Sequence, residues 1–386
     1  MNFQLDLLLD LPNITVKHFH EIEGHILFEL ECLNDHINCP HCDHEIDNIN
    51  QVEYSLIRDL SIVGKPVILK VPRRQFHCFN CGKFVTERLS FINWCHRYTS
   101  RYEKWIYEEV KKTSVDQVSR NEGLSSNTIN NIFKKQAEEK LTQKKCWKNL
   151  KRLSLDEFAN RKGYKSFITT VVDLDKGELI EVVNSHKQDE IISALEKIPK
   201  EVRDGVEEVS IDMWGGFKKV VETVLCNAKI VYDHFHVIKN VNKELNKLRK
   251  RLKVKGKKMP YLLWKNREDL KPDEKIELRK VLDTSPCLSI AYEFKEELRT
   301  IYATGRTVHS GKNRIKKWLR LARLILRESA DMIENHLDGI CNYFENHTSS
   351  GTTEGINTKI KLIKRKAYGL PNFENLRLRL LVEFRT

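Results

Sequence analysis

The stretch Arg152–Val183, RLSLDEFANRKGYKSFITTVVDLDKGELIEVV, decides the fold because three β-rich runs follow one another in it. Runs rich in Val, Ile, Thr and Phe predict strands, here three strands in a meander. Two further strand-like runs, VEEVSID (Val206–Asp212) and AKIVYD (Ala228–Asp233), alternate with helical stretches. A meander followed by strands that alternate with helices predicts a mixed α/β sheet.

Acidic residues stand near the ends of two of these predicted strands. Asp156 lies near the end of the first strand, and Asp212 ends the fourth. If these two strands are the central ones, the two carboxylates lie side by side, where they repel each other unless a cation sits between them. Paired Mg²⁺ ions held by carboxylates activate water in phosphodiester chemistry. Side chains alternate along a strand, so Asp156 and Glu157 are predicted to face opposite sides, and only one of them joins the site.

A third acid comes from the C-terminal stretch Ser349–Leu381, SSGTTEGINTKIKLIKRKAYGLPNFENLRLRLL. Glu354 falls in the first turn of a predicted helix, and the helix continues with cations suited to a DNA backbone, namely Lys359, Lys361, Lys364, Arg365 and Lys366. The alternative is structural, since acids at helix N-termini stabilise the helix dipole and acids at strand ends are often solvated. The order of the three acids along this topology favours a catalytic site.

The charge of the chain indicates a polyanionic partner. With 386 residues, 31% of them charged, and a formal net charge of +13, the chain is expected to form several domains and to bind nucleic acid. An anionic membrane is the alternative partner. No apolar run approaches the roughly 20 residues that span a bilayer, and the N-terminal stretch MNFQLDLLLDLPN contains acids and lacks a basic start. We therefore expect a cytoplasmic protein without a membrane segment.

Two cysteine pairs predict a structural zinc site. NCPHCDH and FHCFNCGKF each hold a C-x-x-C, which together supply Cys39, Cys42, Cys78 and Cys81. Four thiolates complete a tetrahedral Zn²⁺ site with no open position. Reduced structural cysteines, a redox pair, or replacement of one thiolate by His41, His44 or His77 are the alternatives. Nearby cations, among them Arg73 and Arg74, are predicted to contact phosphate.

A helix-turn-helix is predicted over Ser114–Gln136, SVDQVSRNEGLSSNTINNIFKKQ. Apolar Val115 and Val118 precede a turn at Gly123, and a second helix restarts behind Ser125 or Ser126. An ordinary helical hairpin has the same pattern. In the helix-turn-helix reading, the second helix presents its polar side chains to DNA, and the candidates are Asn127, Thr128, Asn131 and Lys134.

The three catalytic segments resemble transposases of the ISL3 insertion-sequence family. The similar segments are DEFANRKGYKSFITTVVDLDKGELIEVV, SIDMWGGFKKVVETVLCNAKIVYDHFHVIKNVNKEL and TEGINTKIKLIKRKAYGLPNFENLRLRLL. The resemblance covers nearly the whole chain, since the family also carries an N-terminal four-cysteine zinc finger and a helix-turn-helix. It implies an RNase H-like catalytic domain with an Asp, Asp, Glu triad on Asp156, Asp212 and Glu354, which would bind Mg²⁺ or Mn²⁺.

The resemblance also implies a domain organisation. We expect a multidomain α/β chain with a zinc-finger module over 1–95, a helix-turn-helix region over 96–148, an RNase H-like mixed-sheet domain over 149–242 and 348–386, and an all-helical insertion over 243–347. Asp233, His234 and His236 are then expected near the site, where they orient a carboxylate or contact substrate. Trp214 and Trp318 are candidate stacking residues for a DNA end, although an aromatic side chain in a helical insertion more often belongs to the core.

The expected function is that of a DNA transposase. The zinc finger and helix-turn-helix would bind terminal inverted repeats, and the acid triad would cut the strand and join it to target DNA. A dimer or higher oligomer on DNA, in a bacterial-type nucleoid, is expected. The alternatives are a DNA-binding regulator or domesticated relative without catalysis, and an RNase H-like nuclease without strand transfer.

Overall fold

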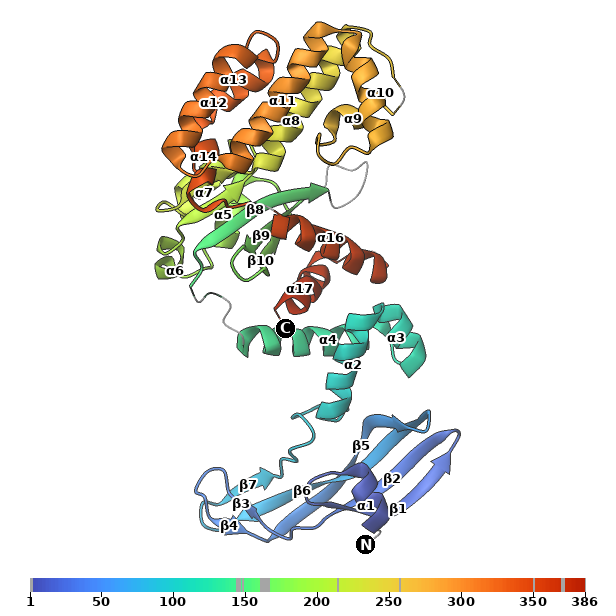
Figure 1. Cartoon of the computed structure of the whole chain (residues 1–386). Coiled ribbons are helices and arrows are strands. Elements are labelled where there is room, and N and C mark those ends of the chain that lie inside the picture. Colours follow the sequence, from blue (N-terminus) through green and yellow to red (C-terminus); the bar gives the residue numbers. More distant parts are fainter. Residues whose placement is uncertain are drawn as a thin grey trace. The chain divides into compact units, whose positions relative to one another are not determined.

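The computed structural model describes residues 3–143, 147, 149–159, 167–213, 215–256, 258–349, 351–368 and 372–385. The chain forms two compact units, which are taken separately below (Figure 1). The first unit comprises residues 1–143 and 364–379, and the second comprises residues 144–363 and 380–386.

A twisted sheet forms most of the N-terminal part of the first unit. Helix α1 (Phe3–Leu9) precedes strands β1 (Ile14–Ile22), β2 (His25–Cys32), β5 (Ile49–Ile62), β6 (Lys65–Cys78) and β7 (Lys83–Thr86). The strand order is β1-β2-β6-β5, and β7 also pairs with β6. Strands β5 and β6 are each 14 residues long. Alternating burial along β6 explains this length, because one continuous face packs on the core.

The helix-turn-helix prediction is confirmed in the same unit. Helix α2 (Ser100–Lys112) is followed by α3 (Val115–Glu122) and α4 (Ser126–Gln143). Gly123 ends α3 with φ of 65°, a left-handed conformation that glycine adopts without strain. Ser125 Oγ accepts a hydrogen bond from Thr128 N at 3.1 Å and so caps α4. The buried inner face of the motif is lined by Val115, Val118, Ile129, Ile132 and Phe133.

A five-stranded mixed sheet forms the centre of the second unit. Its order is β10-β9-β8-β11-β12, built from β8 (Arg152–Ala159), β9 (Phe167–Asp173), β10 (Glu178–Val183), β11 (Glu208–Ile211) and β12 (Lys229–Tyr232). The first three strands pair antiparallel, and β8, β11 and β12 are parallel. Helices α5 (Gln188–Leu195), α6 (Lys200–Asp204) and α7 (Gly215–Val224) connect the later strands. This arrangement confirms the predicted RNase H-like mixed sheet, with the first and fourth strands adjacent at its centre.

Between β12 and the C-terminal helices, the described residues form helices without strands. These helices are α8 (His234–Arg251), α9 (Tyr261–Trp264), α10 (Pro272–Asp283), α11 (Pro286–Thr304), α12 (Val308–Ala322), α13 (Arg327–Asn335), α14 (Leu337–Cys341) and α15 (Tyr343–Asn346). The chain then continues into α16 (Gly351–Lys366) and α17 (Phe373–Phe384). Within the described residues, no helix is long and apolar enough to cross a membrane.

The tryptophan predicted to stack on DNA from this helical part lies in the core instead. Trp318 is 0% exposed, and its indole Nε1 donates a hydrogen bond to Phe294 O at 2.8 Å. Trp318 is therefore a core residue, which is the alternative to stacking on DNA, because the apolar face of α12 packs inward and buries the indole. Trp214, the other stacking candidate, lies outside the described residues.

Candidate active site and metal centre

The four cysteines come together at the end of the N-terminal sheet. Cys39 and Cys42 belong to the loop between β3 (Ile37–Asn38) and β4 (Glu45–Ile46), and Cys78 and Cys81 belong to the loop between β6 and β7. The two loops have the same backbone design. The amide of Asp43 donates to Cys39 O, and the amide of Gly82 donates to Cys78 O, each at 2.8 Å. Both donors have left-handed backbones, with φ of 57° and 68°.

The geometry of the sulfur atoms fits a zinc ion. Cys39 Sγ lies 3.7 Å from Cys81 Sγ, and Cys42 Sγ lies 3.6 Å from Cys78 Sγ. Tetrahedral zinc with bonds of about 2.3 Å places its sulfur ligands about 3.8 Å apart. Hydrogen bonds from the Asn80 side chain and the His44 backbone lower the pKa of the Cys42 thiol to about 6, which favours a thiolate. A closed four-sulfur site of this kind is structural.

The residues predicted to contact DNA from the helix-turn-helix lie on the outer side of α4. Asn127, Asn131 and Lys134 are exposed, and Thr128 is half-buried. The Thr128 hydroxyl lies 2.9 Å from Ser125 Oγ, so this side chain also takes part in the helix cap. Lys134 Nζ lies 3.8 Å from Glu138 of the same helix. These four positions share the solvent side of the second helix of the motif.

The two neighbouring arginines of β6 have different environments. Arg74 is buried, and its Nε and Nη2 donate to the two carboxylate oxygens of Glu87, each at 2.7 Å. Arg74 Nη1 donates to Asn34 O at 2.7 Å, so the guanidinium is fully engaged inside the module. Arg73 is half-buried and lies over the exposed ring of Trp94, 5.3 Å from its centroid. The structure thus corrects the prediction for Arg74 and leaves Arg73 accessible to phosphate.

The register of the central strands places two of the predicted acids together. Strands β8 and β11 are parallel neighbours, and Ser154 pairs with Ser210. Continuing this register by two residues along each chain brings Asp156 level with Asp212, which directly follows β11. The sequence prediction placed Asp156 near the end of one strand and Asp212 at the end of its neighbour; β8 continues to Ala159, and the extended register brings the two aspartates level.

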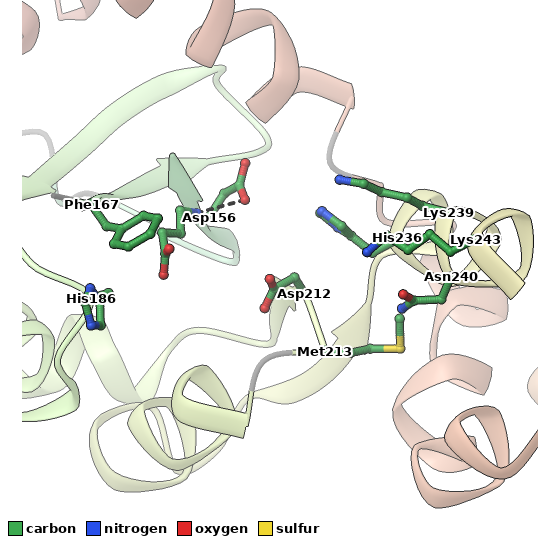
Figure 2. A pocket seen from close by; sticks show the side chains of 10 residues that line it. Asp156, Phe167, His186, Asp212, Met213, His236, Lys239, Asn240 and Lys243 are labelled. Atoms are coloured by element: carbon green, nitrogen blue, oxygen red, sulfur yellow. Dashed lines mark hydrogen bonds between the residues drawn. The ribbon is translucent and has the colours of Figure 1, made fainter. Parts of the chain in front are cut away.

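Both aspartates line one cavity of about 560 Å³ at this end of the sheet. Figure 2 shows Asp156 and Asp212 there, with His236, Lys239, Asn240 and Lys243 contributed by α8. The rest of the lining comes from Glu157, Phe167, His186 and Met213. The cavity therefore combines carboxylates from the sheet with cations and an amide from the first helix after it.

Glu157 joins the cavity, contrary to the prediction that it faces the other side. The pairing of β11 with β8 ends at Ser154, so none of the described strands flanks Glu157 on that side. Beyond Ser154, β8 pairs with β9 alone among the described strands, and the long Glu157 side chain reaches the cavity at this uncovered edge. The Asp156 carboxylate is itself turned toward the backbone, because its Oδ1 accepts a hydrogen bond from Glu157 N at 2.8 Å.

Burial and mutual repulsion make the negative charge of this cavity unfavourable. Burial raises the pKa of Asp156, and the charge of Asp212 raises it further, although Glu157 N, His236 and Asn357 act in the opposite direction. Burial also raises the pKa of Glu157, and the charges of Asp212 and Asp156 add to this effect. Clustered carboxylate oxygens are the ligands that Mg²⁺ and Mn²⁺ take. A divalent cation fits this donor set and would relieve its repulsion.

The third predicted acid lies on the helix that contacts Asp156. Asn357 of α16 is 7% exposed, and its Nδ2 donates to Asp156 Oδ2 at 2.6 Å. Glu354 stands one turn earlier, and residues three apart share a helix face. Glu354 is exposed and is not among the described residues that line the cavity.

The carboxylates of Asp156, Asp212 and Glu354 therefore do not converge on one metal position in this structure. Within the described ranges, the four cysteines are the one group of three or more His, Cys, Asp or Glu whose ligand atoms lie within 4.8 Å of one another. The structure brings Asp156 and Asp212 to one cavity and places Glu354 on the adjoining helix.

Asp233 and the two histidines organise the start of α8. Asp233 is 1% exposed and caps the helix by accepting a hydrogen bond from Phe235 N at 3.1 Å. His236 Nδ1 lies 3.3 Å from Asp233 Oδ2, and this carboxylate raises the pKa of His236. Burial lowers the pKa of His234, whose ring lies 5.2 Å from that of Tyr343. Of the three residues, His236 alone is among the described residues that line the cavity.

The cations predicted on α16 differ in their availability. Lys359 Nζ donates to Glu383 O at 3.0 Å and lies 4.4 Å from the centroid of the Phe384 ring, so it ties α16 to the end of the chain. Arg365 is exposed and Lys364 is half-buried. Arg365 is thus the most accessible of these three predicted DNA contacts.

Sequence reasoning did not identify Lys239 and Lys243 in the cavity or Asn357 beside it, and it placed Glu157 on the other face. The spacing of His236, Lys239 and Lys243 by three and four residues is that of one helix face, and this signal was available in the sequence. Likewise, the spacing of Glu354 and Asn357 in EGIN places both on one face of a helix. Nothing in the sequence showed which carboxylate Asn357 meets, since its partner lies 201 positions away.

Comparison with known proteins agrees with this arrangement along the chain. The zinc-finger of transposase IS204/IS1001/IS1096/IS1165 matches residues 35–81, and the helix-turn-helix domain of transposase family ISL3 matches residues 87–137. A DDE-type transposase family of the ISL3 group matches residues 153–380, which is more than half of the chain.

Two curated relatives are transposases. The transposase for insertion sequence element IS1001 of Bordetella parapertussis is 26% identical over 361 residues, which cover 90% of this chain and 88% of the relative. The transposase for insertion sequence element IS1557 of Mycobacterium tuberculosis is 24% identical over 302 residues, covering 69% of this chain and 66% of the relative. The zinc-binding cysteines, the helix-turn-helix and the RNase H-like sheet stand in the order of these matched families, and the chain belongs to the ISL3 family of DNA transposases.

Proposed function

We propose that this chain cuts DNA at the ends of an insertion element and joins the freed strand to target DNA, with Asp156, Asp212 and Glu354 as the metal-binding acids. The observation that carries the proposal is the level register of Asp156 and Asp212 on two adjacent strands, at a cavity they both line. Two Mg²⁺ or Mn²⁺ ions at these carboxylates would supply an activated water and stabilise the leaving oxygen.

The residues of the chain hold and orient the reacting groups in this scheme. Asn357 and the backbone of Glu157 fix the two oxygens of Asp156. Glu354 would complete the ligand set from the same face of α16, which requires its side chain to turn toward the cavity. In the first reaction, water attacks the phosphodiester at the end of the element and releases a 3′-hydroxyl. In the second, that hydroxyl attacks a target phosphodiester and releases a new 3′-hydroxyl, so that the number of phosphodiester bonds is conserved.

The remaining parts of the chain are assigned to DNA recognition. We infer that the zinc-finger module (1–95) and the helix-turn-helix region (96–148) bind the terminal inverted repeats. Arg73, Asn127, Thr128, Asn131 and Lys134 are the proposed contacts there. The catalytic domain (149–242 and 348–386) carries the insertion (243–347), and the proposed DNA contacts Lys359, Lys364 and Arg365 lie on α16. A homodimer or larger assembly would hold both element ends together.

The test is nicking of a labelled DNA duplex that carries the terminal repeat of the element. Wild-type protein in Mg²⁺ is expected to cut at the repeat boundary, and Asp212→Asn is expected to bind the duplex without cutting it. The matched control is Glu207→Gln, which removes an exposed acid that precedes the same strand and pairs with Lys151. If wild type and both variants bind alike and none cuts in Mg²⁺ or Mn²⁺, the chain is a DNA-binding regulator. Cutting without any strand joining identifies a nuclease.

A further inference from the structure

The cavity beside Asp156 and Asp212 carries positive charge that a metal site does not need. Lys239 and Lys243 line it from α8, together with His236 and Asn240 (Figure 2). An ammonium group repels a divalent cation, so two lysines at a metal site lower its affinity for metal unless an anion is also present. The charge pattern therefore fits a metal ion and a polyanion that bind together.

Both lysines are available to such an anion. The side chains of Lys239 and Lys243 are exposed, and neither forms an ion pair with a described residue. Lys239 lies 5.9 Å from the centroid of the exposed Phe235 ring. By contrast, Lys247, one further turn along α8, is paired with Glu328 at 2.6 Å and is not among the described lining residues.

The spacing of Lys239 and Lys243 places both side chains on one face of α8. Residues four apart lie on the same face of a helix, about 6 Å apart along its axis. His236 precedes Lys239 by three residues on this face, and Asp233 fixes the start of the helix by capping it. The helix thus starts at a buried cap, and this face lines the same cavity as the two aspartates.

We propose that Lys239 and Lys243 form a phosphate clamp that holds a DNA strand over the carboxylates of Asp156 and Asp212. The clamp rests on the proposed function for the identity of the polyanion. It gives α8, the helix that leads into the insertion, a direct role in binding the strand to be cut. The lysines supply charge to phosphates that flank the reacting one, and the carboxylates bind the metal.

The test compares the salt dependence of DNA binding with the binding of Mn²⁺. Each lost phosphate contact lowers the slope of log Kd against log salt by about 0.9 for duplex DNA. Lys239→Gln/Lys243→Gln is expected to lower this slope by about 1.8 and to weaken binding at low salt. Lys247→Gln is the matched control and is expected to keep the wild-type slope. Lys239→Arg/Lys243→Arg, which keeps both charges, should also keep it.

Mn²⁺ binding, followed by calorimetry without DNA, separates this inference from the proposed function. The double glutamine variant is expected to bind Mn²⁺ at least as tightly as wild type, because two repelling charges are gone. Asp212→Asn is expected to lose Mn²⁺ binding and keep the DNA salt slope. A double variant with the wild-type salt slope overturns the clamp, whatever Asp212→Asn does. Unchanged Mn²⁺ binding in Asp212→Asn overturns the proposed metal site. The salt slope of the double glutamine variant then still tests whether the two lysines bind DNA.

Discussion

At the scale of single residues, Asn357 connects the helix that carries Glu354 to the strand that carries Asp156. Its amide donates to Asp156 Oδ2 at 2.6 Å, and its own Oδ1 is buried without a hydrogen-bond partner among the described residues. Partners that orient a metal ligand typically contribute a factor of about 10 to 100 in metal affinity or activity. Asn357 is therefore expected to position Asp156 for catalysis.

Replacing Asn357 by Leu, which has a similar shape, should slow Mg²⁺-dependent nicking by about 10- to 100-fold and raise the Mg²⁺ concentration needed for half of the maximal rate. Thr353→Val is the control, because Thr353 is a fully buried residue of the same helix whose hydroxyl has no hydrogen-bond partner among the described residues. Equal rates and equal Mg²⁺ requirements in the two variants would show that the Asn357 contact serves packing alone.

Arg74 is expected to stabilise the N-terminal module instead of binding DNA. Removing one partner of a buried ion pair leaves the other charge unpaired, which costs about 3 to 5 kcal/mol. Arg74→Met should therefore lower the urea midpoint of this unit strongly, since Glu87 stays buried. Arg73→Met should leave the midpoint nearly unchanged and weaken DNA binding. A small stability loss in Arg74→Met together with a large loss of DNA affinity would contradict this assignment.

At the scale of elements, close packing between α12 and α15 depends on a glycine. A Cβ atom built on Gly311 would lie 2.2 Å from a ring carbon of Phe344, which is 1% exposed. Because the ring cannot move away without disturbing the core, Gly311→Ala should lower the free energy of unfolding by about 1 to 3 kcal/mol, despite the better helix propensity of alanine.

The control for this prediction is Gly355→Ala, since a Cβ atom at Gly355 meets no described atom within 4 Å. That variant should be neutral or slightly stabilising in thermal unfolding. The double variant Gly311→Ala/Phe344→Leu should recover part of the stability lost in Gly311→Ala. A Gly311→Ala protein that melts at the wild-type temperature would show that the two helices can separate at little cost.

The two cysteine loops are expected to depend on a bound zinc ion for their folded structure. Because zinc binding and folding are coupled, chelation should melt the loops and lower the melting temperature of the N-terminal unit. Metal analysis is expected to find one zinc ion per chain, and Cys81→Ser should reduce its affinity. The control Cys226→Ser changes an exposed cysteine of the other unit and should keep the zinc. Full zinc retention in Cys81→Ser would exclude the four-sulfur site.

At the scale of the whole molecule, the hydrophobic pattern of the segments and their order along the chain were enough to predict most of the fold. The β-rich runs of Arg152–Val183 and the strand ending at Asp212 were enough to place Asp156 and Asp212 on central strands, because a meander followed by βα units allows few topologies. The same holds for the cysteine loops and the helix-turn-helix, whose spacing is local. The ISL3 resemblance added the order of the parts, and the matched families confirm it.

What could not be predicted depends on contacts between distant residues. Arg74 was predicted to contact phosphate because no residue near it in the sequence indicates that it pairs with Glu87, which follows β7. Trp318 looked available because an amphipathic helix does not reveal which side meets the core. Glu157 was excluded by strand alternation, a rule that ends where the pairing of β11 ends. In each case the sequence identified the residue but not the part of the chain that it contacts.

The central claim is that the carboxylate of Asp212 binds a divalent metal ion required for DNA cutting. The most direct test is whether replacing this carboxylate by a thiolate changes which metal ion supports cutting. The measurement is nicking by Asp212→Cys and Asp212→Asn on the terminal-repeat duplex, in Mg²⁺ and in Mn²⁺. A thiolate is a poor ligand for Mg²⁺ and a better one for softer metals. We predict that Asp212→Cys is inactive in Mg²⁺ and regains cutting in Mn²⁺, while Asp212→Asn stays inactive in both. Wild-type cutting by Asp212→Cys in Mg²⁺, or identical behaviour of the two variants in both metals, would contradict the claim.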